Sequence, residues 1–440
     1  MQRSIYKQLL QWKDSANRKP LILLGARQVG KTYILKEFGH REFSKFIYIN
    51  CHNNSFVTAL FRDFNIERIL YDIGQEYETE IIIGETLIFF DEIQETHNGL
   101  SVLKYFCEEK RELHIVVAGS LLGISLKEDE SYPVGKIDTL RLYPMSFIEF
   151  LYANNRHKLC ESVETQKWES LSTSSETLTN LLRQYYFCGG MPEAVQEWVN
   201  TKDTTAVRKI QSDIIDAYER DIAKHTKVLA QRIHLVWNSV PAQLSKENKK
   251  FIFGLLKKGA RANEFEIALQ WLCDAGIVYK VQQISMPKQP LKFYQSDGFK
   301  IYLLDCGLLA CMSGIRPKDL LLGMDIFTEF KGAFTENFVL QQIIADTATI
   351  FPRQTFYYSK DNSQMEIDFL IESPNRTIPI EVKAGNVVHS KSLYNFINND
   401  FAQLKLKGVR FSLLPYTDQD WMENVPLYGI NGYLQDEFRE

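Results

Sequence analysis

The sequence lacks any apolar run of the roughly 18 residues needed to cross a bilayer, and it shows no secretion signal at its start. The first stretch, MQRSIYKQLLQWKDSANRKP, spreads charged and polar residues through its apolar positions and has no small-residue cleavage site. Its 7 cysteines are scattered and form no C-x-x-C pair, which excludes a disulfide framework and a zinc ribbon. We therefore expect a cytoplasmic protein with reduced thiols and no membrane partner.

A strong charge of either sign is also missing. The 440 residues carry a net charge of −4, with a pI near 6.1, so the chain as a whole does not attract nucleic acid. Hydrophobic residues make up 45% and charged residues 24%, as in an ordinary globular protein. This length predicts about two to four domains, and any binding to DNA would need a local basic surface.

A phosphate-binding loop is present near the start. Residues Gly25–Thr32, GARQVGKT, match G-x-x-x-x-G-K-[ST] between the apolar run Leu21–Leu24 and the helix-compatible stretch YILKEF. The glycines let successive backbone N–H groups point at phosphates. Lys31 is expected to reach the β and γ phosphates of ATP, and the Thr32 hydroxyl to ligate Mg²⁺. The predicted nucleotide-binding residues are Gly25, Ala26, Arg27, Gln28, Val29, Gly30, Lys31, Thr32 and Tyr33.

Two further apolar runs end in polar residues. Leu87–Phe90 is followed by Asp91 and Glu92, and His114–Ala118 is followed two residues on by Ser120. Fully apolar runs are typical of parallel strands buried on both faces, and ligands lie at the carboxyl ends of such strands. We expect Asp91 to hold the Mg²⁺, Glu92 to deprotonate the attacking water, and Ser120 to touch the γ phosphate or that water. A solvated turn at the acids and a simple strand-ending turn at Ser120 remain alternatives.

The middle of the chain contains its most basic window. A predicted helix beginning near Asn263 is followed by two strand-like stretches, Ile277–Ile284 and Leu291–Ser296, which together resemble a winged helix. The basic residues before that helix could neutralise DNA phosphates, although a solvated face on a packing module explains them equally well. They are Lys246, Lys249, Lys250, Lys257, Lys258 and Arg261.

The C-terminal part contains a second polar constellation. Two stretches of alternating polarity, joined by the turn residues ESPNRT, predict a hairpin with Asp368, Glu381 and Lys383 on one face. Glu336, on a preceding helix, is placed to join them. Neighbouring carboxylates bind Mg²⁺, which polarises a phosphodiester, and a lysine stabilises the charge that develops. A surface hairpin of mixed charge is the competing interpretation.

These motifs carry two resemblances. The stretches GARQVGKT, LIFFDEIQ, VAGSLL, LRLYPMSFIEF and FCGGMPEAV, in this order, resemble a bacterial and archaeal group of AAA-type ATPases with a C-terminal domain of unknown function. The order Glu336, Asp368, Glu381-x-Lys383 resembles the PD-(D/E)XK nucleases. The first resemblance implies a parallel-stranded AAA+ core and a helical lid. It also implies an arginine, from the lid or a neighbouring subunit, that completes the site. Arg141 and Arg220 are the candidates, and surface or ion-paired residues are the alternative for both. A homo-oligomer is thus an open option.

The expected fold is α/β with four parts: an AAA+ P-loop ATPase core at 1–160, a helical lid at 161–228, a winged helix-like connector at 229–315 and a PD-(D/E)XK nuclease-like domain at 316–440. Within the lid, the polar residues 161–180 predict a loop or solvated helix, and Gly189-Gly190 predicts a structural turn. The leading hypothesis is Mg²⁺-dependent ATP hydrolysis coupled to DNA binding or processing, with DNA cleavage left open. The alternative is an ATP-dependent switch that binds a protein partner through an inactive C-terminal module.

Overall fold

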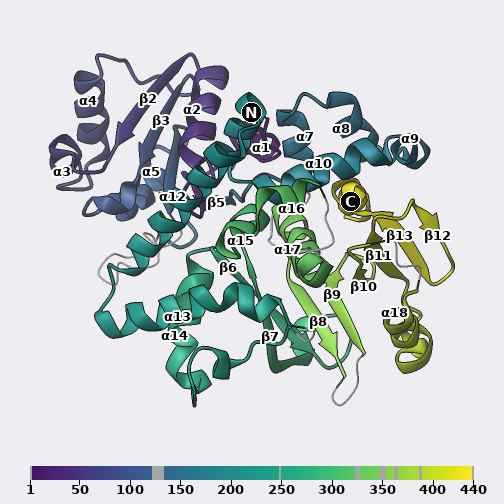
Figure 1. The fold of residues 1–440 in the computed structure, drawn as a ribbon. Helices are drawn as coiled ribbons and strands as arrows, with labels where there is room; N and C mark the ends of the chain where they lie inside the picture. The colour runs from purple at the N-terminus through teal and green to yellow at the C-terminus, as the bar shows by residue number, and fades with distance from the viewer. Residues whose placement is uncertain are drawn as a thin grey trace. The chain divides into compact units, whose positions relative to one another are not determined.

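The computed structural model describes residues 2–120, 133–246, 249–322, 328–346, 353–360, 365–385 and 389–438 (Figure 1). The side chains of Ser120 and of residues 328–331 lie outside the described part. The chain forms two compact units. The first is residues 2–143 with 274–276, and the second is 144–273 with 277–440.

The first unit is built on a five-stranded parallel sheet with the order β2-β3-β4-β1-β5. Every residue of β1 and β3 is buried, which explains their unbroken apolar sequence. The expected parallel α/β fold is confirmed. The strands are β1 (Leu21–Gly25), β2 (Lys45–Asn50), β3 (Thr86–Asp91), β4 (His114–Ser120) and β5 (Asp138–Arg141).

Helices cover both faces of this sheet. In Figure 1 helix α2 lies on one side of strands β2 and β3, and helices α3, α4 and α5 lie on the other. Helix α4 shows how the sequence fixes this layer, because Asn65 caps its first turn and Ile66, Ile69 and Ile73 pack into the core at helical spacing. The helices are α1 (Tyr6–Asp14), α2 (Lys31–Glu42), α3 (Ser55–Leu60), α4 (Ile66–Glu76) and α5 (Gly99–Glu109).

Helices make up the first part of the second unit. The polar stretch 161–180 is helical, since Leu171 and Leu178 are buried and anchor it despite its serines and threonines. The helices before the second sheet are α7 (Phe147–Ala153), α8 (His157–Glu164), α9 (Trp168–Thr173), α10 (Ser175–Cys188), α11 (Pro192–Thr201), α12 (Thr204–Ile222), α13 (Lys227–Leu244) and α14 (Ala262–Asp274). Those that follow are α15 (Cys306–Met312), α16 (Pro317–Leu321), α17 (Thr328–Ala345), α18 (Lys391–Asn395) and α19 (Ile430–Glu437).

An eight-stranded mixed sheet, with the order β12-β13-β11-β10-β9-β8-β6-β7, forms the rest of this unit. The expected antiparallel hairpin is present as β9 and β10. Strand β6 pairs with β7 and also with β8, so the hairpin predicted as a wing is the edge of this same sheet. The strands are β6 (Val278–Ile284), β7 (Gln295–Leu303), β8 (Thr355–Ser359), β9 (Glu366–Glu372), β10 (Thr377–Val382), β11 (Gly408–Ser412), β12 (Thr417–Asp418) and β13 (Met422–Pro426).

One predicted strand in this region is wrong at its start. Residues Leu291–Tyr294 form a short 3₁₀ helix, and the strand begins only at Gln295. The Leu291 side chain is fully buried, and its N–H donates to a carboxylate oxygen of Glu372 at 2.9 Å instead of entering a strand ladder. The winged helix interpretation and the four domain boundaries stay predictions.

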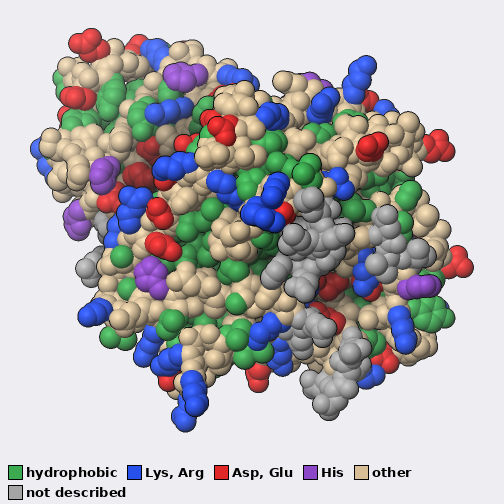
Figure 2. Space-filling model, viewed as in Figure 1, with side chains coloured by type: hydrophobic (Ala, Val, Ile, Leu, Met, Phe, Trp, Pro, Cys, Tyr) green, Lys and Arg blue, Asp and Glu red, His purple; other side chains and the backbone are tan. Residues whose placement is uncertain are grey.

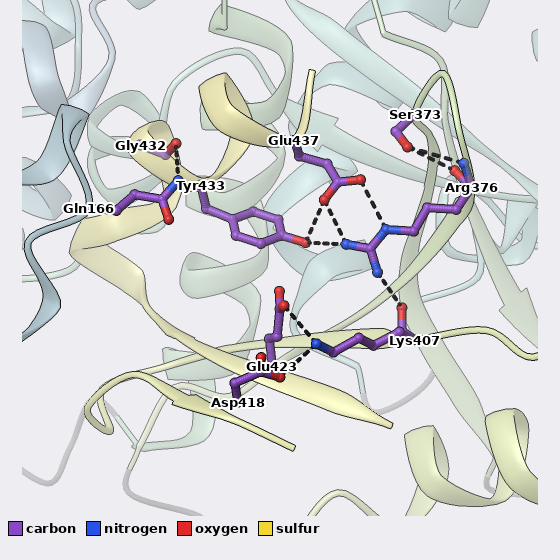
Figure 3. A network of polar contacts seen from close by, with 9 residues as sticks. All are labelled: Gln166, Ser373, Arg376, Lys407, Asp418, Glu423, Gly432, Tyr433 and Glu437. Carbon is purple, nitrogen blue, oxygen red and sulfur yellow. Dashed lines mark hydrogen bonds and ion pairs between the residues drawn. The ribbon is translucent and has the colours of Figure 1, made fainter. Parts of the chain in front are cut away.

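The C-terminal helix is fastened to the sheet by polar contacts (Figure 3). The Arg376 guanidinium donates to both oxygens of Glu437, at 3.0 and 2.6 Å, and to the Tyr433 hydroxyl at 3.2 Å. On another side of helix α19, Gln166 donates to the Gly432 carbonyl at 3.2 Å. A Cβ at Gly432 would lie 1.9 Å from the Val163 carbonyl oxygen. Helix α8 and the turn that follows it therefore pack directly on helix α19.

The Gly189-Gly190 turn lies at a buried polar junction of the second unit. The Gly190 N–H donates to Asp305 at 2.6 Å, and the Gly190 carbonyl accepts from the Met145 N–H at 2.6 Å. Asp305 also caps helix α15 by accepting from the Leu308 N–H at 2.9 Å. The turn thus joins three segments that are far apart in sequence, which agrees with the structural role expected for it.

Candidate functional site

The phosphate-binding loop leads from β1 into α2. Gln28 and Gly30 have φ values of 65° and 94°, and this left-handed backbone makes the tight curl before the helix. Lys31 is only 8% exposed, and its Nζ donates to the carbonyls of Gly25 and Ala26, each at 2.9 Å. Burial lowers the pKa of Lys31 to about 8, although Glu92 and Asp91 act in the opposite direction. Lys31 is therefore held within the loop.

Asp91 ends β3 beside the first turn of α2. Its Oδ2 accepts hydrogen bonds from the Thr32 hydroxyl at 3.0 Å and the Tyr48 hydroxyl at 3.1 Å. Burial raises the pKa of Asp91, and these two hydrogen bonds act against that rise. Its Oδ1 is buried and has no hydrogen-bond partner among the described residues. A free carboxylate oxygen beside a hydroxyl suits Mg²⁺, which prefers hard oxygen ligands, so these residues fit the expected ion.

Glu92 follows in the left-handed region, with a φ of 53°. Its N–H donates to the Ala118 carbonyl at 3.1 Å, which fixes the turn against β4. One oxygen of its carboxylate accepts a hydrogen bond from the side-chain amide of Gln94. Gln94 is only 3% exposed, and its Oε1 is buried without a partner among the described residues.

Sequence reasoning missed Gln94 and Tyr48. Gln94 could have been predicted from the sequence, because it stands two residues after Glu92 in the run LIFFDEIQ and is therefore close to that carboxylate. Tyr48 carried none, because its place beside Asp91 depends on the register of β2 against β3, in which Asn50 pairs with Asp91. Such a register cannot be read from a separate segment of sequence.

For the remaining predicted residues of this site, the structure describes mainly a position in the fold. The backbone of Ser120 pairs in register with Gly25 at the carboxyl ends of β4 and β1, whereas its side chain lies outside the described part. Arg141 ends β5 and pairs in register with Leu24. Arg220 belongs to the other unit, where its Nε donates to the Asp216 carbonyl at 3.2 Å within helix α12. Tyr33 is 57% exposed.

The hairpin of the second unit brings its predicted residues together. The pairing of β9 with β10 ends at Phe369 with Ile380, and its continuation sets Asp368 across from Glu381. Asp368 accepts from the Val382 N–H at 2.7 Å, while Glu381 accepts from Lys383 Nζ at 2.9 Å. The other oxygen of Glu381 is buried without a partner among the described residues.

Glu336 joins this hairpin, together with residues that were not expected there. Its carboxylate forms an ion pair with Lys249 and accepts from the Tyr302 hydroxyl at 3.1 Å. Burial tends to raise the pKa of Glu336, but Lys249 and Lys300 outweigh burial and lower it. Burial, followed by the charge of Glu336, raises the pKa of Asp368. Lys300 is fully buried and forms an ion pair with Glu366.

We name Glu336, Glu366, Asp368 and Glu381 the C-terminal carboxylate cluster. Lys249, Lys300 and Lys383 are interspersed among these acids and act on them electrostatically. Within the part of the chain that the structure describes, no group of three or more His, Cys, Asp or Glu side chains is arranged to hold a metal ion. The cluster has suitable oxygen ligands, but its own lysines already compensate much of their charge.

The glycine loop follows the buried parallel strand β1 and leads into a helix, and Asp91 ends β3, on the far side of β4 from β1. This arrangement defines a P-loop nucleotide-binding protein. Residues 17–151 match the family described as "AAA domain". Residues 179–319 match a domain of unknown function (DUF8612), and residues 331–428 match another (DUF4143). Residues 17–151 thus form an AAA-type ATP-binding domain, and residues 331–428 a C-terminal domain of unknown function, as the motifs indicated.

Two individual proteins also show similarity. An uncharacterised protein of Haemophilus influenzae is 23% identical over 307 residues, which cover 69% of this chain and 70% of that protein. The crystal structure of Cdc6p from Pyrobaculum aerophilum covers 73% of this chain and 95% of its own, at 12% identity and a TM-score of 0.26. No helix among the described residues is long and apolar enough to span a membrane.

Proposed function

We propose that the first unit hydrolyses ATP, with Mg²⁺ held by Thr32 and Asp91. The observation that carries this proposal is the 3.0 Å hydrogen bond from the Thr32 hydroxyl to Asp91, at the end of the loop that holds Lys31. When bound, Mg²⁺ neutralises the charge that develops on the phosphates. Lys31 binds the β and γ phosphates, and Tyr48 holds Asp91 in position from the neighbouring strand.

In this proposal Glu92 takes the proton of the attacking water. The Gln94 amide N–H donates to Glu92 and so fixes the direction of its carboxylate, while the free Gln94 carbonyl is available to accept the second proton of that water. Two acceptors on one water would direct its lone pair toward the phosphate. Ser120, together with an arginine for which Arg141 is the candidate in the same unit, completes the proposed site.

We further propose that hydrolysis is coupled to DNA binding or processing by the second unit. Lys258 and Arg261 are exposed, and Figure 2 shows basic side chains protruding near the helix labelled α14 in Figure 1. Lys257 is paired with Glu264 at 2.8 Å, and Lys249 is paired with Glu336. The surface that supports DNA contact is therefore smaller than the basic window of the sequence.

Duplex DNA is expected to raise the steady-state rate of ATP hydrolysis. The double variant Lys258→Glu/Arg261→Glu should reduce this stimulation, because losing contacts to phosphates weakens DNA binding. Each lost contact should also lower the slope of log K against log salt concentration by about one. Lys318→Glu, a charge reversal of an exposed lysine outside the basic window, is the control. A hydrolysis rate indifferent to DNA at low salt would contradict the coupling and favour the switch that binds a protein partner.

A second candidate function is Mg²⁺-dependent cleavage of DNA by the C-terminal carboxylate cluster. The convergence of Glu336, Asp368 and Glu381 with Lys383 supports it. The ion pair between Glu336 and Lys249 instead supports the alternative of an inactive binding module. Whether the carboxylates bind a divalent metal ion or only the lysines of this chain separates these two possibilities.

A further inference from the structure

Lys249 belongs to the basic window but faces inward. Its side chain is 12% exposed and that of Glu336 is 5% exposed, and the two form an ion pair. Tyr302 donates to the second oxygen of Glu336 at 3.1 Å. Both oxygens of Glu336 are therefore occupied by donors from this chain.

The positive charges of the lysines nearly balance the negative charges of the cluster's carboxylates. Four carboxylates stand among three ammonium groups, and Lys300 and Lys383 are each paired with their own carboxylate, Glu366 and Glu381. Lys300 lies in β7 and Lys383 directly follows β10, whereas Lys249 comes from the stretch between α13 and the short 3₁₀ helix Phe253–Leu255. A hard divalent cation needs carboxylate oxygens that face it without a competing positive charge.

We propose that Lys249 is the resident cation of the C-terminal carboxylate cluster, and that the cluster takes a divalent metal ion only after Lys249 has left Glu336. This inference rests on the second candidate function, because it concerns the same carboxylates. It also gives the ion pair a role, since an occupied Glu336 closes the cluster to a metal ion.

The surroundings of Lys249 allow such an exchange. Breaking a buried ion pair is unfavourable when it leaves a charge without a partner, so Lys249 can leave Glu336 only if a metal ion takes its place there and another anion receives Lys249. Two residues on, the Phe251 N–H donates to the Phe299 carbonyl at 2.8 Å, and the Phe251 ring stacks on that of Phe299. This contact anchors the segment while the long side chain of Lys249 changes partner. A phosphodiester group is an anion that could replace Glu336 as that partner, so DNA would open the cluster to its cation.

The test measures Mn²⁺ binding to the full chain by electron paramagnetic resonance, without nucleotide and in an Asp91→Asn background that removes the ATPase metal site. Lys249→Met is expected to bind Mn²⁺ at least about tenfold more tightly than the background protein, because about 1.4 kcal/mol of competition corresponds to a factor of ten. Adding Glu336→Gln to Lys249→Met should abolish the gain. Lys258→Met, at an exposed lysine of the same window, should bind as the background does.

The outcomes separate the inference from the function on which it rests. If the background protein binds Mn²⁺ as tightly as Lys249→Met and loses it on Glu381→Gln, the metal site stands and the role of Lys249 is overturned. If no variant binds Mn²⁺, the metal site itself is overturned and the inference with it. Lys249→Gln, which keeps a hydrogen-bond donor but not the charge, gives the same comparison if Lys249→Met does not fold.

Discussion

Replacing Glu92 with glutamine is expected to lower the turnover number for ATP hydrolysis by about 10²–10⁴-fold, the usual contribution of a general base. The amide keeps the size of the side chain but cannot accept the proton of the attacking water. Lys31, Thr32 and Asp91 are unchanged in this variant, so the dissociation constant for ATP should stay within a few-fold of the wild-type value. Turnover and equilibrium ATP binding, measured on the same preparation, check both halves of the prediction.

Glu95→Gln is the matched control, because Glu95 is a more exposed carboxylate in the same short turn. It should leave turnover essentially unchanged. If Glu92→Gln hydrolyses ATP as fast as the wild type, Glu92 is not the base, and only nucleotide binding would remain supported at this site.

Replacing Gly190 with alanine is expected to destabilise the second unit by about 3 kcal/mol, at the upper end of the usual cost of overpacking. A Cβ at this position would lie 2.1 Å from the carbonyl oxygen and 2.8 Å from the amide nitrogen of Met145, so backbone rather than a flexible side chain would have to move. The same movement would strain the hydrogen bond from Gly190 to Asp305. Thermal unfolding should show the midpoint of this unit falling by about 6–10 °C.

Gly332→Ala provides the comparison, because Gly332 lies within helix α17 of the same unit and an added Cβ meets nothing within 4 Å there. That substitution should be neutral or slightly stabilising, since alanine favours a helix more than glycine does. Equal midpoints for the two alanine variants would refute the packing assigned to the Gly189-Gly190 turn.

The parts of the fold that could be predicted are those with a local cause. The loop at Gly25–Thr32 needs its glycines for its own backbone, and the run before Asp91 is apolar because β3 is buried on both faces. The hairpin of β9 and β10 follows from alternation and turn residues that lie within a short stretch of sequence. In each case the residues that determine the structure are neighbours in the chain.

The parts that could not be predicted depend on distant partners. The β6–β7 hairpin joins the C-terminal sheet through β8, some 70 residues further on. Lys249 stands in a run of lysines that suggests a solvated or DNA-facing surface. Its actual partner, Glu336, is 87 residues away, and nothing near Lys249 in the sequence indicates it.

The measurement that tests the central claim most directly is the rate of phosphate release from ATP by the wild-type chain and by Lys31→Ala, each with Mg²⁺ and with excess EDTA. The proposed site predicts turnover by the wild type that requires Mg²⁺ and is lost in Lys31→Ala, because the loop then has no charge to bind the β and γ phosphates. Wild-type turnover that survives EDTA, or that is equal in Lys31→Ala, would contradict Mg²⁺-dependent hydrolysis at this loop.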